Sequence, residues 1–142
     1  MKRKKYYKTV HEIIITGHWI TDNISQEIKS FGATEPQYNV LRILSDRDKP
    51  TTVMEITEGM VQRSSNVTRI IDKLLDKKFV IRKECSTNRR KMDITITDKG
   101  LTFLKKLDKK VHAFHYPMMD NLSGKEADAL RYLIEKMKGK LS

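Results

Sequence analysis

The stretch Asn66–Gly100, NVTRIIDKLLDKKFVIRKECSTNRRKMDITITDKG, decides the fold because its apolar period changes half-way along. The first part carries apolar residues at the spacing of one helix face, at Val67, Ile70, Ile71, Leu74 and Leu75. In the second part, Val80–Glu84, which begins with two β-branched residues, is predicted to be a strand, and three later positions alternate, at Met92, Ile94 and Ile96. The stretch therefore predicts a helix followed by a two-stranded hairpin, whose connecting loop Ser86–Lys91 is polar and strongly basic.

Two shorter helices are predicted upstream of this stretch. Thr34-Glu35-Pro36-Gln37 and Thr52-Val53-Met54-Glu55 are capping boxes, in which the first and fourth side chains satisfy free backbone N–H groups. They open a helix to about residue 45 and a short helix to about residue 58, with a turn at 46–51 between them. Ser64 or Ser65 is predicted to cap the helix that follows. The order of helix, short helix, helix and hairpin is that of a winged helix-turn-helix.

Longer helices are predicted on both sides of this region. A helix over about 9–30 carries isoleucine-rich apolar positions at helical spacing. Thr97 is predicted to cap a helix that continues past Phe114 and that Pro117 kinks or ends. Ser123-Gly124-Lys125-Glu126 is a third capping box, which opens a final helix. The predicted fold class is therefore mainly α with a small two-stranded β wing.

Charge and composition narrow the classes of function. The 142 residues include 29 basic and 18 acidic ones, a formal net charge of +11, and residues 63–110 alone hold fifteen basic and six acidic residues. This excess favours a nucleic-acid partner over an ordinary solvated surface. A single cysteine, Cys85, excludes an internal disulfide and a cysteine-based zinc site. No nucleotide-binding loop, nucleophile–base pair or cofactor motif is present, so we expect no enzyme activity and no cofactor.

The N-terminal segment and the length of the apolar runs indicate where in the cell the protein is expected. Met1–Lys8 is basic but is followed by no apolar core of a secretory signal. No apolar run approaches the length of a membrane span, and a lone cysteine suits a reducing compartment. We therefore expect a cytoplasmic protein with no membrane contact.

The ordered motifs resemble the MarR family of bacterial regulators. The family's wing pattern is matched by Asn88-Arg89-Arg90 and Ile96-Thr97-Asp98-Lys99-Gly100, its recognition helix by Val67-Thr68-Arg69, and its second helix by Gln37–Leu41. The resemblance implies a homodimer that grips palindromic double-stranded DNA, in many members a repressor released by a small, often phenolic, effector or by oxidation. It implies a helical dimerisation region from 1–33 and 101–142, and a winged helix-turn-helix DNA-binding domain over 34–100. Unpartnered apolar stripes on the first and last helices independently favour a two-fold dimer.

Candidate DNA contacts follow from this resemblance and from the residue types. Arg90 aligns with the arginine that enters the minor groove, where narrow A·T tracts concentrate negative potential. The expected major-groove residues share the polar side of the recognition helix, namely Ser65, Asn66, Thr68 and Arg69. Phosphate contacts are expected from Lys73, Arg89 and Lys91. The competing interpretations are that Ser65 only caps the helix, that Arg69 contacts phosphate, and that the hairpin tip is merely solvated.

Three positions depart from the family pattern. Asn88 replaces the usual Asp, so the wing is expected to be held by a neutral hydrogen bond. Lys78 stands where a glycine is common, and a left-handed conformation there would be strained. Val61 replaces a frequent turn glycine.

The remaining aromatic, histidine and cysteine residues can be explained by packing or by local structure. Trp19, Tyr38 and Phe114 line an effector pocket or simply pack in the core. His112 and His115 are three residues apart, but no acid pattern confirms a metal site, so none is expected. Cys85 is interpreted as structural, because thiol-sensing relatives carry their cysteine near the N-terminus. Met1–Lys8 is expected to be a disordered, solvated tail.

Two rival classes remain beside an operator-binding regulator. A winged-helix module can instead bind RNA or a protein partner, and a preference for palindromic duplex would separate these cases. A small-molecule sensor that does not bind DNA would leave the basic cluster unexplained.

Overall fold

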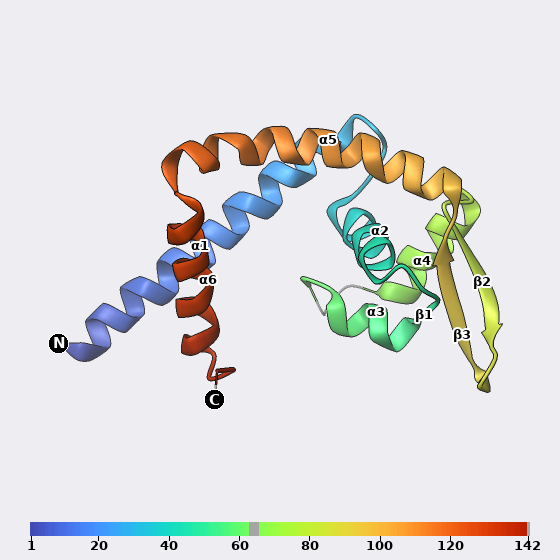
Figure 1. The fold of residues 1–142 in the computed structure, drawn as a ribbon, viewed down its shortest axis with the longest axis horizontal. Coiled ribbons are helices and arrows are strands. Elements are labelled where there is room, and N and C mark those ends of the chain that lie inside the picture. Colours follow the sequence, from blue (N-terminus) through green and yellow to red (C-terminus); the bar gives the residue numbers. More distant parts are fainter. Residues whose placement is uncertain (63–65, 142) are drawn as a thin grey trace.

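A computed structural model describes residues 1–62 and 66–141 (Figure 1). The elements in chain order are α1 (Lys2–Lys29), α2 (Glu35–Arg47), β1 (Thr51–Thr52), α3 (Val53–Gly59), α4 (Val67–Asp76), β2 (Val80–Cys85), β3 (Asn88–Ile96), α5 (Asp98–Asn121) and α6 (Gly124–Met137). The segment from α2 to β3 lies beneath one end of the long helix α5, and α6 turns back from its other end (Figure 1). The mainly α fold with a small antiparallel sheet is confirmed.

Side-chain caps begin most of the helices. Thr34 and Ser123 form complete capping boxes with Gln37 and Glu126, as predicted. Thr52 accepts from the backbone N–H of Glu55, but the Glu55 carboxylate pairs with Arg47 at 2.9 Å, so the second box is only half formed. Such caps satisfy backbone donors that a helix start leaves free.

The start of α4 corrects a prediction. Its N-cap is Asn66, whose Oδ1 accepts from the backbone N–H of Arg69 at 3.2 Å. Ser64 and Ser65, which were expected to cap this helix, lie outside the described residues. Asn, Ser and Asp cap about equally well, so spacing alone did not distinguish among three adjacent candidates.

The sheet has three strands rather than the two predicted. Its order is β1-β3-β2, with Thr51 opposite Ile94 and Val80 opposite Ile96. The segment 46–51 was predicted as a turn, but α2 extends to Arg47 and Thr51 is a fully buried strand residue. A two-residue strand is too short to show a period of two, so only its pairing with β3 reveals it.

The wing is more regular than predicted. The segment 86–91 was expected to be a loop, yet β3 already begins at Asn88 and pairs with Cys85. The register shifts between Glu84 and Cys85, so the strands pair irregularly near the tip. Such an irregularity increases local twist and re-aims the side chains beside it.

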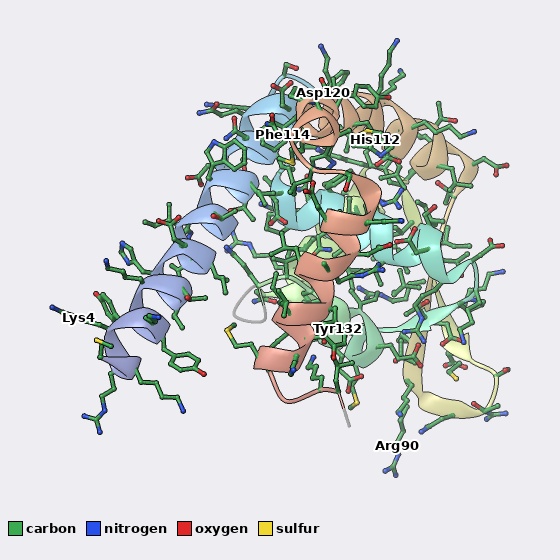
Figure 2. All side chains as sticks on the ribbon, turned by 60° about the vertical axis from the view of Figure 1, so that its left-hand side comes forward. Lys4, Arg90, His112, Phe114, Asp120 and Tyr132 are labelled. Atoms are coloured by element: carbon green, nitrogen blue, oxygen red, sulfur yellow. The ribbon has the colours of Figure 1, made fainter. Side chains whose placement is uncertain are left out.

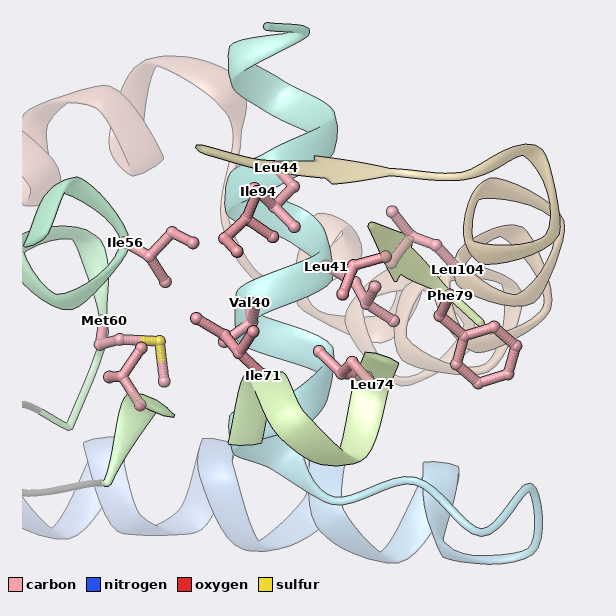
Figure 3. Close-up of a cluster of buried hydrophobic side chains, with 12 residues drawn as sticks. Val40, Leu41, Leu44, Ile56, Met60, Ile71, Leu74, Phe79, Ile94 and Leu104 are labelled. Atoms are coloured by element: carbon pink, nitrogen blue, oxygen red, sulfur yellow. The ribbon is translucent and has the colours of Figure 1, made fainter. Parts of the chain in front are cut away.

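The main hydrophobic core lies between α2, α3, α4, the sheet and the first turns of α5 (Figure 3). The apolar face predicted for α4 is confirmed, since three of its five positions are buried and Ile70 and Leu75 pack against the core. Each fully buried Leu or Ile contributes about 1.5–3 kcal/mol relative to an exposed one. A second cluster joins α1 to α5 through Ile28, Ala33, Leu107 and Val111.

The junction between α4, β2 and α5 is locked by backbone contacts. Thr97 caps α5 as predicted, by accepting from the N–H of Gly100, and its hydroxyl also donates to the carbonyl of Lys78 at 2.8 Å. A Cβ on Gly100 would clash with the carbonyl oxygen of Phe79. Lys78 itself has a φ of 63°, the left-handed conformation that a glycine would adopt without strain.

Two predictions concern the outer helices. The basic segment 1–8 was expected to be a disordered tail, but α1 begins at Lys2. No glycine or proline occurs before Gly17, and lysine and arginine are good helix formers, so nothing stops the helix from continuing. Helix α5 contains Pro117 and ends only at Asn121, although its ribbon bends toward that end (Figure 1).

Large apolar side chains remain exposed on the outer helices. On α1 these include Val10, Ile14 and Trp19, and on α6 Leu130, Leu133 and Met137. Across the part of the chain that the structure describes, no helix has both the length and the apolar character needed to cross a bilayer.

Candidate nucleic-acid interface

The outward face of α4 is polar and accessible. Thr68, Arg69 and Lys73 are exposed on the side opposite the buried Ile71 and Leu74. Asn66 is exposed at the N-terminal end of the helix, where the free backbone N–H groups also lie. The predicted major-groove residue Ser65 falls outside the described residues. The first turn of α4 thus offers amide, hydroxyl and guanidinium groups on one accessible surface.

The wing places an exposed arginine at the lower edge of the molecule in the view of Figure 2. Figure 2 shows Arg90 extending away from the body, and Arg89 and Lys91 are exposed on either side of it. The Oδ1 of Asn88 accepts from the backbone N–H of Arg90 at 3.0 Å. This is the neutral hydrogen bond expected where the family has an Asp, and it holds the backbone. Among the residues that the structure describes, the Arg90 guanidinium has no hydrogen-bond or ion-pair partner.

An ion pair connects the wing to α4. Arg82 of β2 contacts Asp72 of α4 at 2.8 Å, and both side chains are partly exposed. Exposed ion pairs contribute little to the free energy of unfolding. What this pair shows is that the wing strand β2 lies close to the outer side of α4. This ion pair was not predicted, because the ten-residue separation of its two partners spans a helix end and a turn.

A hydrogen bond from α2 holds the segment that precedes α4. Asn39 accepts from the backbone N–H of Val61 at 2.8 Å through its side-chain oxygen. Val61 is not among the residues with positive φ, so a β-branched side chain is accommodated here without strain where a glycine is frequent. Asn39 was also missed, since its partner is 22 residues away.

The MarR family model matches residues 33–92, which run from the end of the α1–α2 connection into the wing. The chain carries a MarR-family domain. The family is one of transcriptional regulators, not of enzymes.

Named relatives agree with this assignment. The chain is 27% identical over 119 residues to the HTH-type transcriptional regulator MhqR of Bacillus subtilis, covering 83% of this chain and 81% of the relative. It is 24% identical over 123 residues to the transcriptional repressor MprA of Escherichia coli, covering 86% and 70%.

Solved structures share the fold of this chain. The regulator BldR from Sulfolobus solfataricus superposes with a TM-score of 0.83 at 18% identity, covering 99% of both chains. A mutant MarR from E. coli complexed with operator DNA superposes with a TM-score of 0.79 at 19% identity, covering 94% of this chain and 95% of that one. At these identities the likeness establishes the winged-helix architecture alone.

The three aromatic residues predicted for an effector pocket do not form one group. Trp19 and Phe114 meet edge to face, with ring centroids 5.3 Å apart and planes at 61°. Tyr38 has a different partner, because its hydroxyl donates to Asp108 at 2.7 Å. Burial and this hydrogen bond raise the pKa of Tyr38 above its ordinary value.

Two histidines and the cysteine have local partners. The rings of His112 and His115 lie 6.5 Å apart between centroids. Burial and the neighbouring His112 lower the pKa of His115. Within residues 1–62 and 66–141, no three metal-ligating side chains gather. Cys85 contacts the Thr87 hydroxyl at 3.2 Å, and this hydrogen bond lowers the pKa of the thiol.

Proposed function

We propose that this chain is a sequence-specific DNA-binding transcriptional regulator, which represses transcription as a homodimer on a palindromic operator. One observation carries the proposal. The polar first turn of α4 and the exposed wing arginine are both accessible, and the Arg82–Asp72 ion pair connects α4 to β2, the strand that pairs with the arginine-bearing strand β3. This pairing suits a winged regulator, in which a helix reads bases in the major groove while the wing reads the adjacent minor groove.

The first turn of α4 is assigned to the major groove. Since the Oδ1 of Asn66 is engaged in the helix cap, its amide N–H groups remain available as donors. Arg69 can donate two hydrogen bonds to a guanine edge, and Thr68 can contact a base or a thymine methyl group. Lys73, one turn further along, is assigned to a phosphate.

The wing is assigned to the minor groove and the backbone beside it. Arg90 is the residue that enters the groove, because its side chain extends free of the body (Figure 2). Arg89 and Lys91 flank it and are assigned to phosphates. Phosphate contacts supply affinity and register, while Arg90 favours sites with a narrow minor groove.

The dimer is supported by the exposed apolar residues of α1 and α6. Contiguous exposed apolar surface is typical of an association site, and two-fold symmetry would cover it on both copies at once. Two winged domains would then meet half-sites roughly one DNA turn apart. Repression is proposed because a relative is named a transcriptional repressor. An effector pocket lined by Trp19, Tyr38 and Phe114 stays a prediction.

The test is selection of duplexes from a random DNA pool by the purified chain at moderate salt. We expect an enriched palindrome, bound by a species of twice the 16.6 kDa chain mass in light scattering. Ile14→Asp, which places a charge on the exposed apolar side of α1, should yield a folded monomer with weakened binding, whereas Glu12→Gln on the same helix should not. Selection without any enriched sequence, or stronger binding to structured RNA than to duplex, would contradict the proposal.

A further inference from the structure

Two residues lie at the boundary between the two hydrophobic clusters. Tyr38 of α2 and Phe103 of α5 are the half-buried side chains that pack against both the main core and the α1–α5 cluster. Apolar contact is non-directional, so packing alone resists separation of the clusters better than it resists their rotation. A directional contact at this boundary would therefore hold the relative orientation of the winged region (residues 34–100) and the outer helices more firmly than packing alone.

Asp108 supplies such a contact. Its Oδ1 accepts from the Tyr38 hydroxyl at 2.7 Å, and its Oδ2 accepts from the Arg42 guanidinium at 3.0 Å. Tyr38 and Arg42 are one turn apart on α2. A single carboxylate of α5 therefore accepts hydrogen bonds from two successive turns of α2.

Burial distinguishes this contact from an ordinary surface ion pair. The Asp108 side chain is only 16% exposed, while Asp46, which also binds Arg42 at 2.9 Å, is 62% exposed. Charge-assisted hydrogen bonds strengthen when water is excluded, and two acceptor atoms with fixed partners define an angle as well as a distance. Asp46 orients the guanidinium from the solvent side.

We propose that Asp108 is a positioning residue, which sets the orientation of α2 on α5 and thereby the spacing of DNA half-sites that the dimer accepts. Helix α2 transmits this orientation, because its Val40, Leu41 and Leu44 share the main core with Ile71 and Leu74 of α4. Two copies of a winged region whose tilt is fixed can meet half-sites at only one separation. The inference about spacing rests on the proposed function.

The first experiment measures orientation without DNA. Spin labels at Glu58→Cys on α3 and Lys109→Cys on α5, both exposed positions, are placed in a Cys85→Ser background and diluted with unlabelled chain. The distance distribution between the two labels should broaden with Asp108→Asn and with Tyr38→Phe. It should stay as narrow as in the parent with Asp46→Asn, the matched acid on the solvent side.

The second experiment measures half-site spacing. The unlabelled variants select from duplexes in which two half-sites of the wild-type palindrome are separated by variable spacers. Wild type and Asp46→Asn should each enrich one spacing. Asp108→Asn should enrich several, and its affinity for the wild-type spacing should fall about tenfold, the equivalent of one lost hydrogen bond. A purely structural role would lower the melting temperature and overall affinity but leave the preferred spacing unchanged.

The outcomes separate this inference from the proposed function. If the wild-type chain selects no palindrome, the proposed function is wrong. The distances between the spin labels still decide whether Asp108 sets the orientation of α2 on α5. If Asp108→Asn does not fold, Tyr38→Phe, which removes one hydroxyl, decides in its place. Unchanged distance distributions in the Asp108 and Tyr38 variants, or equal broadening by Asp46→Asn, would overturn the inference.

Discussion

At the scale of single residues, the position of the wing depends on residues whose side chains are restricted by close backbone contacts. Gly100 sits against the Phe79 carbonyl, and Thr97 bridges Gly100 to the carbonyl of Lys78. These contacts explain physically why a Thr-x-x-Gly sequence follows the wing. They fix where β3 ends and α5 begins, and so place the wing relative to the long helix.

Gly100→Ala should destabilise the fold. The added methyl group meets backbone that cannot move without breaking the bond between the Thr97 N–H and the Phe79 carbonyl. We expect a loss of about 1–3 kcal/mol in the free energy of unfolding, the usual cost of overpacking. Urea denaturation measures it. Gly124→Ala is the control, because a Cβ there has open space and should change stability little.

Arg90→Ala should weaken operator binding without unfolding the protein. The side chain is exposed at the wing tip, and only its backbone N–H bonds to Asn88. We expect a loss of about 1–3 kcal/mol in binding free energy, as for other arginines that read a groove. Titration of labelled operator measures this loss. Lys109→Ala removes an equal charge from α5, so comparable weakening by that variant would refute the wing assignment.

At the scale of elements, one side of α4 packs in the hydrophobic core and the other side is exposed for binding. Its apolar face packs in the main core, while its outer face and first turn remain free for a ligand. The helix has only ten residues, too few for stability in isolation, so tertiary packing and the Asn66 cap hold it. The residue that caps α4 is thus also one that we assign to DNA.

Two substitutions at Asn66 should separate capping from DNA contact. Asn66→Ala removes the cap and should cost about 1 kcal/mol of stability. Asn66→Asp keeps an acceptor for the Arg69 N–H and suits the helix dipole, so stability should be retained. The new negative charge would face the DNA, so operator affinity should fall for Asp more than for Ala. Thermal melts and DNA titrations on both variants check this, and the reverse order of affinity would remove Asn66 from the interface.

At the scale of the whole molecule, charge and shape act together. The chain has a net charge of +11. Its winged region lies under one end of α5 (Figure 1), and its outer helices expose apolar side chains. The basic surface suits a polyanion, and the apolar surface suits a second copy. A dimer would bring two such regions to one duplex and raise affinity through simultaneous contact.

Operator binding should depend steeply on salt. If a dimer neutralises about eight phosphates, released counterions give a slope of log K against log salt near −7. Titrations across several salt concentrations measure the slope. Replacing Lys73 by Ala, which removes one proposed phosphate contact per protomer, should make it less steep by roughly two. A slope near zero would show that phosphates do not drive binding.

Much of the fold could be predicted from the sequence because helices are encoded over short distances. The apolar face of α4 repeats every three or four residues, and the caps at Thr34, Thr97 and Ser123 lie three residues from the groups they satisfy. The wing was predicted from alternation in β3, and Arg90 from its place in a motif. Each of these signals lies within one element or one turn, where chain geometry alone sets which groups meet.

What the tertiary structure decided involves groups far apart in the chain. The buried strand residue Thr51 is defined only by pairing with β3, and the wing is tied to α4 by Arg82 and Asp72. Tyr38 was predicted for a pocket, yet it binds Asp108, 70 residues away. No local period encodes such contacts, because they exist only once the hydrophobic clusters bring α2 and α5 together. The sequence by itself therefore determined the elements and the candidate reading residues, and packing determined how those residues are oriented.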